Sequence, residues 1–311
     1  MSIEATIVSI LRSIIYISTP ILLATLGEIY AERSGVLNLG IEGIMSMGAV
    51  CAFIITFTTG NPLLGVLISL IVGAILAFIH AFVSASLNAN QVVSGLALAM
   101  FGLGLSSTIG QRYVGEVLRN YLKPVPVPVL SQIPIIGPAF FVQDIIVYMS
   151  YVLVVVLWFI LFKTRWGLYI RAVGENPYTA DAMGVNVIFV RYVCVILGGA
   201  LAGLGGAYIT LAYMPTWIEG ITMGKGWIAI ALVILAMWDP LKGFLATYFF
   251  CGVMVVAIRV QVFGANPYII NSIPYIATII VMILGASETL RRRIGAPAAL
   301  CKPFIREERA L

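Results

Sequence analysis

Charged residues are scarce in this sequence. Of its 311 residues, 10% are charged and 61% are hydrophobic. A soluble domain carries about 25% charged and about 45–50% apolar residues. A chain so poor in charge cannot cover a water-facing surface, so we expect an integral membrane protein with the bilayer as its solvent. The net charge of +5 lies largely in short segments between apolar runs, where it orients spans, so it predicts no nucleic-acid partner.

Residues for catalysis and metal binding are scarce as well. The single histidine, His80, lies in an apolar run without a second metal ligand at helical spacing. The cysteines are far apart and form no CxxC pair; they are Cys51, Cys194, Cys251 and Cys301. An intramembrane enzyme would need a nucleophile and a base that meet within the bilayer. We therefore expect no catalytic residue, no metal site and no cofactor in this chain.

Long apolar runs are what the sequence does contain. A span needs roughly 20 mostly apolar residues, and the chain offers candidates at 7–29, 38–58, 62–84, 91–110, 143–163, 188–213, 226–240, 243–263 and 268–290. The sequence predicts an all-α integral membrane protein, a polytopic bundle of about nine transmembrane helices in one domain, 1–311.

The charges between spans suggest an orientation. If the segment around Arg165 and Arg171 is cytoplasmic, nine spans place the N-terminus outside and the C-terminus inside. The basic tail, 291–311, is then cytoplasmic, as the positive-inside rule favours. Residues 111–142 contain five prolines, so we expect them to be extended or looped and to form an external connection.

The inner loop, 164–187, carries a set of helix-capping residues. Asn176 suits an N-cap, Pro177 the first helical position, and Gly184 the position after the end. Between them, residues 178–183 predict a short helix of about two turns, which is too short to be stable alone. It must dock on a surface, which could be a partner or its own bundle.

A second polar stretch precedes the second span. Gly35, Gly40 and Gly43 permit a turn, and buried carboxylates near the hydrocarbon are costly unless they face protein or water. One interpretation is a helix break that lines the translocation path; the other is an inner loop with solvated charges. The candidate path residues are Glu28, Asn38, Glu42, Asn90 and Gln91, although Asn90 and Gln91 are also typical helix caps.

Two further stretches bear on packing. The run from Trp227 to Trp238 is short for a full span, and a tryptophan at each end suits anchoring at the membrane interface. Small residues crowd 198–207, which predicts close helix packing rather than a pore. Gly102 and Gly104 are interpreted in the same way.

Three of these stretches carry a family resemblance. They are GEIYAERSGVLNLGIEGIMSMGA at 27–49, RAVGENPYTADAMGVN at 171–186 and GKGWIAIALVILAMWDPLKG at 224–243. With them the chain resembles permease subunits of ABC importers, in the nucleoside and simple-sugar branch of the branched-chain amino acid and simple-sugar permease superfamily. The resemblance covers nearly the whole chain and implies a type II importer arrangement, although larger relatives have ten spans.

The resemblance also implies roles and partners. The inner loop would be the coupling helix that docks on the ATPase, formed here by Gly174, Glu175, Asn176, Pro177, Ala180 and Gly184. No Walker A sequence is present, so ATP and Mg²⁺ would bind a separate ATPase with two nucleotide-binding modules. The other implied partners are a paralogous permease and a substrate-binding lipoprotein, in a bacterial or archaeal cytoplasmic membrane.

Other transport classes remain open on composition. A secondary transporter should carry ionisable residues deep in its spans and often two inverted halves, and this chain shows neither. A channel fits the composition but not the motifs. Within the importer class, a nucleoside or purine derivative is favoured over a simple sugar on the resemblance alone.

Overall fold

The computed structural model describes residues 3–260, 272–273, 276, 279–280 and 295–305. Within these ranges, seven helical segments are long and apolar enough to cross a membrane. They are α1 (Ile3–Arg33), α2 (Ile41–Thr59), α3 (Pro62–Ala81) with the π-helical turn η1 (Phe82–Ser86), α4 (Gln91–Gly110) with the 3-10 turn η2 (Gln111–Tyr113), α6 (Ile145–Lys163), α9 (Val187–Tyr208) with the π-helical turn η4 (Ile209–Tyr213), and α11 (Pro240–Val260).

The all-α membrane fold is confirmed, but the count of nine spans is not. The candidate at 226–240 is α10 (Lys225–Leu235), whose 11 residues are too short to cross a bilayer. Met237 and Trp238 leave the helix with positive φ angles of 54° and 55°, and Pro240 begins the next helix. The left-handed conformation at these two residues is incompatible with a continuous right-handed helix, so α10 and α11 are separate helices. The candidate at 268–290 lies almost entirely outside the described residues.

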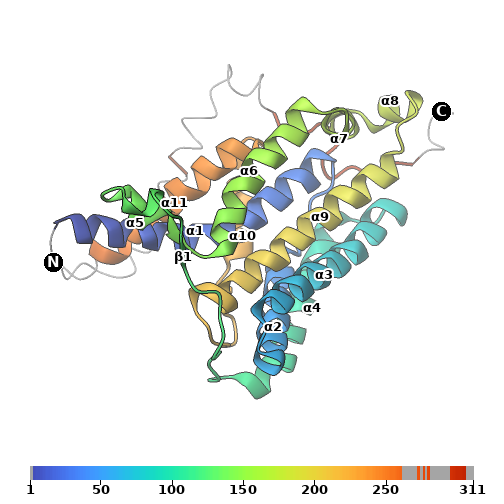
Figure 1. Ribbon diagram of the computed structural model, residues 1–311. Coiled ribbons are helices and arrows are strands. Elements are labelled where there is room, and N and C mark those ends of the chain that lie inside the picture. The colour runs from blue at the N-terminus through green and yellow to red at the C-terminus, as the bar shows by residue number, and fades with distance from the viewer. Residues whose placement is uncertain (1–2, 261–271, 274–275, 277–278, 281–294, 306–311) are drawn as a thin grey trace.

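Close packing centres on α9, which runs beside α1, α2 and α3 (Figure 1). A Cβ built at Gly27 of α1 would lie 2.6 Å from the carbonyl oxygen of Gly198 on α9. A Cβ at Gly206 would overlap the carbonyl oxygen of Met45 on α2. The small residues of 198–207 therefore bring backbones together, as predicted. Gly104 is the exception, because a Cβ there would meet nothing within 4 Å.

The proline-rich segment, 111–142, is mostly irregular. It holds β1 (Val125–Pro126), which pairs antiparallel with β2 (Val142–Gln143), the 3-10 turn η3 (Leu130–Gln132) and the short helix α5 (Ile136–Phe140). The expectation of a segment without helix is thus wrong at α5. Pro138 is the third residue of α5. The first four N–H groups of a helix have no intrahelical acceptor, so a proline there costs no helical hydrogen bond.

The two ends of the molecule are different. The start of α1 and α5 lie at one end, and α8 (Pro177–Ala182) lies at the other (Figure 1). We call these the α5 end and the α8 end. α7 (Arg165–Glu175) connects α6 to α8, so residues 164–187 fold into two helices.

Candidate functional site

α8 has the caps that its sequence predicts. The backbone N–H of Thr179 donates to Oδ1 of Asn176 (3.0 Å), and Pro177 is the first helical residue. Gly184 has φ +84°, a left-handed conformation that favours glycine. Sequence reasoning missed α7, whose available signal was Thr164: its hydroxyl accepts the backbone N–H of Gly167 (3.2 Å) at the helix start.

The six residues of α8 present two faces. Pro177 and Ala180 are buried, and the ring of Tyr178 packs against Phe304 with 5.2 Å between centroids. On the other side, Thr179, Ala182 and Met183 are exposed, together with Glu175 and Asn176 from the turn before the helix. Met183 is 80% exposed, a large apolar side chain without cover in the described part of the chain. The helix thus lies on its own bundle and still offers a free face.

Gly174 fixes the position of this loop against α1. A Cβ at Gly174 would overlap the carbonyl oxygen of Arg33, the last residue of α1. The carbonyl of Gly174 in turn accepts the backbone N–H of Ala299 (2.9 Å). Only a residue without a side chain permits this close approach.

A non-helical, largely buried segment at residues 34–40 separates α1 from α2, and we call it the break. Gly35 has φ +91°. The backbone N–H of Asn38 donates to Oε1 of Glu28 (2.8 Å), and that of Leu37 donates to Oε1 of Gln91 (2.9 Å). Because unpaired backbone groups in a membrane protein cost several kcal/mol, these buried side chains stabilise the break.

His80 braces the same break from α3. One ring nitrogen lies 3.0 Å from the carbonyl oxygen of Leu37, and the other lies 3.0 Å from Oγ of Ser94 on α4. The histidine is buried and its two nitrogens both have partners. This agrees with the prediction of a packed histidine rather than a catalytic one.

Glu42 holds the start of α10 rather than the break. Its carboxylate accepts the hydroxyl of Thr222 (2.6 Å) and the backbone N–H groups of Gly224 (2.9 Å) and Gly226 (2.6 Å). A carboxylate at a helix N-terminus is favoured by the helix dipole and by the free N–H groups there. Sequence reasoning did not find Thr222 as a partner.

The five candidate path residues therefore do not form one lining. Glu28, Asn38 and Gln91 meet at the break, Glu42 lies at α10, and all four are buried. Asn90 is exposed and caps α4 by accepting the N–H groups of the second and third residues, at 3.0 and 3.2 Å. In this conformation their hydrogen bonds stabilise loops and helix ends, and a role in the translocation path stays a prediction.

The turn after α10 is fastened to the end of α1. The indole N–H of Trp238 donates to the carboxylate of Glu32 (2.5 Å). Arg33 donates to the carbonyl oxygens of Trp238 (3.0 Å) and Met237 (3.3 Å). Trp238 is buried, so the expectation that it anchors at the membrane interface is wrong. The end of α1 is a junction for α7, α10 and the break.

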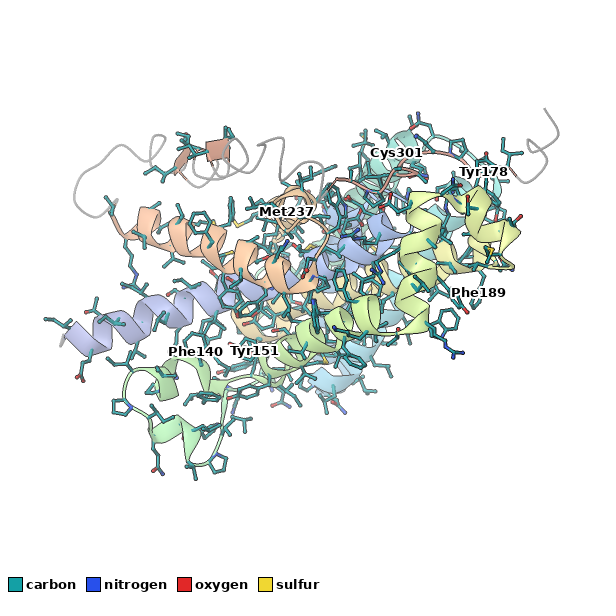
Figure 2. All side chains as sticks on the ribbon, turned by 90° about the horizontal axis from the view of Figure 1, so that it is seen from above. Phe140, Tyr151, Tyr178, Phe189, Met237 and Cys301 are labelled. Carbon is teal, nitrogen blue, oxygen red and sulfur yellow. The ribbon has the colours of Figure 1, made fainter. Side chains whose placement is uncertain are left out.

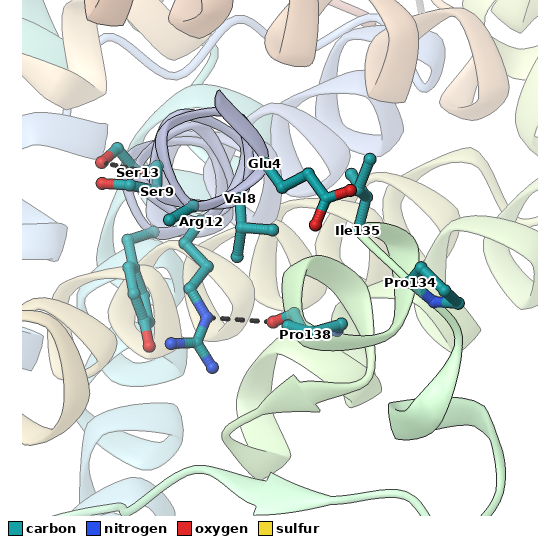
Figure 3. A pocket seen from close by; sticks show the side chains of 10 residues that line it. Glu4, Val8, Ser9, Arg12, Ser13, Pro134, Ile135 and Pro138 are labelled. Atoms are coloured by element: carbon teal, nitrogen blue, oxygen red, sulfur yellow. Dashed lines mark hydrogen bonds between the residues drawn. The ribbon is translucent and has the colours of Figure 1, made fainter. Parts of the chain in front are cut away.

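A cavity of about 670 Å³ lies at the α5 end, between α1 and the residues around α5 (Figure 3). The guanidinium of Arg12 points from α1 toward this loop and donates to the carbonyl oxygen of Pro138 (2.9 Å). The lining also offers the carboxyl group of Glu4 and the hydroxyls of Ser9, Ser13 and Tyr16. This cavity can form hydrogen bonds with an uncharged polar solute.

The sequence matches the family model described as branched-chain amino acid transport system / permease component over residues 10–287. "Putative glucose ABC transporter permease protein TsgC13" of Haloferax volcanii is 37% identical, over 96% of this chain and 98% of its own length. The nucleoside ABC transporter permease NupC of Lactococcus lactis is 33% identical, over 93% and 96%. The guanosine ABC transporter permease NupQ of Bacillus subtilis is 33% identical, over 94% and 95%.

Two of these relatives have a second, more distant counterpart in the same organism. The glucose ABC transporter permease TsgB13 of Haloferax volcanii is 24% identical to this chain, and the guanosine ABC transporter permease NupP of Bacillus subtilis is 23% identical. No solved structure matches this chain. The helical membrane fold, the family match along most of the chain and these relatives agree: the chain belongs to this permease family and is a permease subunit of an ABC importer, a multi-pass membrane transport protein and not an enzyme.

Proposed function

We propose that the chain forms half of the translocation path for a nucleoside or purine-type solute, and that α8 is the element that docks on a separate ATPase. ATP and Mg²⁺ would bind that ATPase, which carries two nucleotide-binding modules. The observation that carries the proposal is the free face of α8, with the exposed side chains of Thr179, Ala182 and Met183.

The length of α8 supports this assignment. A helix of six residues is marginal on its own, so its orientation depends on what covers its two faces. One face already packs on the bundle through Pro177, Ala180 and Tyr178. A cleft on the ATPase would cover the other face, and Met183 would supply an adaptable apolar contact there.

The other partners follow from the relatives. TsgC13 and NupQ each have a second permease in their organism, so we propose a heterodimer with a paralogous permease. A substrate-binding lipoprotein would deliver the solute from outside. The α8 end would then face the cytoplasm, together with the C-terminus, and the N-terminus would lie outside a bacterial or archaeal cytoplasmic membrane.

Two solute classes are supported by different relatives. NupC and NupQ are named for nucleosides and guanosine, whereas TsgC13 is named for glucose and has the higher identity. Hydroxyl groups, with which the cavity at the α5 end can form hydrogen bonds, occur in both solutes. A nucleoside is our first candidate, and a simple sugar taken up by the same machinery is the second.

Uptake into proteoliposomes tests the solute class. The tagged complex, purified with its native partners, is supplied with its binding protein and with ATP inside the vesicles. We expect ATP-dependent uptake of radiolabelled guanosine that excess adenosine inhibits and excess glucose does not. Uptake of glucose without guanosine would favour the sugar alternative, and uptake without ATP would contradict the importer.

The docking role of α8 is tested in the same vesicles. Deletion of residues 175–183, or the single change Glu175→Ala, should abolish substrate-stimulated ATP hydrolysis while the permease still inserts in the membrane. Glu116→Ala, an exposed substitution at a distance from α8, is the control and should keep stimulation. Full stimulation after the deletion would show that α8 is not the coupling element.

A further inference from the structure

Residues 295–305 form an irregular strap, with a turn at 298–301, that packs behind α8. The backbone N–H of Ala299 donates to the carbonyl oxygen of Gly174 (2.9 Å), where α7 ends. At the far end of the strap, Phe304 is buried and packs on Tyr178 of α8. Figure 2 shows Cys301 of the strap and Tyr178 at the same end of the molecule.

The strap also contacts the helix break at residues 34–40. A Cβ built at Gly35 would lie 3.2 Å from the carbonyl oxygen of Ala299 and 3.2 Å from Nη2 of Arg191. The same Nη2 donates to the carbonyl oxygen of Lys302 (3.3 Å), so Arg191 of α9 holds the strap beside the break. Arg191 is buried, which limits how far this part of the strap can shift alone.

We propose that the strap couples α8 to the helix break, with Phe304 and Arg191 as positioning residues. Displacement of α8 by the ATPase then reaches α1 and α2 through residues 295–305. The inference rests on the proposed docking role of α8 and goes beyond it, because it names the route by which movement enters the transmembrane helices.

Packing explains why the strap can carry this movement. Close-packed groups transmit displacement because the interior has few voids to absorb it. Gly174 offers a direct contact from α7 to the end of α1, whereas Phe304 touches α8 itself. Phe304 is 5% exposed, so it is not available to contact an ATPase. An effect of its substitution on coupling must therefore pass through the residues that it packs against inside the permease, among them Tyr178.

The test measures how much guanosine enters proteoliposomes for each ATP hydrolysed. Phe304→Ala removes the ring against Tyr178 and leaves the exposed face of α8 intact. We expect the variant to retain its ATPase and second permease on purification, but to lose about threefold or more in guanosine transported per ATP, since one packed aromatic pair contributes on that scale. Lys302→Ala is the control, because that side chain is exposed and the contact to Arg191 uses the backbone.

The outcomes separate the two proposals. Absence of ATP-driven uptake of both guanosine and glucose by the wild-type complex would contradict the proposed function itself. A wild-type complex that transports, with an unchanged ratio in Phe304→Ala, would overturn the role of the strap. If Phe304→Ala does not accumulate in the membrane, Phe304→Leu keeps an apolar side chain without the ring. That variant should show a smaller loss in the ratio, and a ratio equal to wild type would again overturn the inference.

Discussion

At the scale of single residues, buried polar side chains accept hydrogen bonds from backbone N–H groups near helix ends. Glu28 and Gln91 bond the backbone of the break, and Glu42 bonds the start of α10. In each case a side chain from one helix pairs a backbone N–H of another segment. Removing the side chain would leave that donor without a partner where water is scarce, which makes these positions sensitive to substitution.

Glu42 gives the first prediction at this scale. Glu42→Ala removes the acceptor of three hydrogen bonds, and an unpaired buried donor costs about 1–3 kcal/mol. We expect a lower melting temperature of the detergent-solubilised protein and a smaller yield from membranes. Glu116→Ala, on the exposed surface, should leave both unchanged. Equal melting temperatures for Glu42→Ala and wild type would mean that this carboxylate does not secure α10.

Cys301 gives a second prediction, which concerns the orientation in the membrane. Cys301 is exposed, whereas Cys194 and Cys251 are buried and Cys51 is partly buried. Cys301 lies on the strap at the α8 end. A membrane-impermeant maleimide should label it in inside-out vesicles and not in intact cells, and Cys301→Ser should abolish that labelling. Labelling in intact cells would place the α8 end outside.

The pH dependence of that labelling reports the surroundings of the thiol. Burial raises the pKa of Cys301, and the nearby carboxyl groups of Glu32 and Glu28 add to the rise. The thiolate is the reactive form, so less of it is present at neutral pH than for a free cysteine. The labelling rate should therefore keep rising at pH values above the pKa of a free thiol. A rate that levels off at that ordinary pKa would show that the strap is not packed beside α1.

At the scale of elements, the sequence shows local features and misses distant ones. The caps of α8 were predictable because Asn176, Pro177 and Gly184 act on backbone within a few residues. The partners of Glu42 were not, because Thr222 and Gly226 are about 180 residues away and meet it only after α10 has packed on α2. The glycines of 198–207 indicated close packing, but not which helices they would contact.

Glycine substitutions test the packing of α9. Gly206→Ala would place a Cβ against the carbonyl oxygen of Met45, where backbone atoms cannot move aside cheaply, whereas Gly104→Ala would place one in open space. We expect the first to lower the melting temperature and the membrane yield, since overpacking costs about 1–3 kcal/mol, and the second to change neither. Similar effects of the two substitutions would argue against a tight contact between α9 and α2.

At the scale of the whole molecule, the chain has a bundle built on close contacts with α9 and two dissimilar ends. The α8 end gathers a short, partly exposed helix, the strap and the end of α1. The α5 end holds the cavity around Arg12 (Figure 3). In the orientation that we propose, the solute would arrive at the α5 end and the ATPase would act at the α8 end. Seven of the nine candidate spans were predictable from hydropathy and the family from its motifs, but the hydrogen bonds between helices required the structure.

Binding of α8 to an ATPase is the central step of the proposed mechanism. The direct measurement is purification of the tagged chain from mild detergent, with mass spectrometry of the proteins that accompany it, for wild type and for the deletion of 175–183. We predict an ATPase and a second permease with the wild-type chain, and the second permease without the ATPase after the deletion. Recovery of a stable homo-oligomer without an ATPase from wild type, or equal recovery of the ATPase with the deletion, would contradict the account.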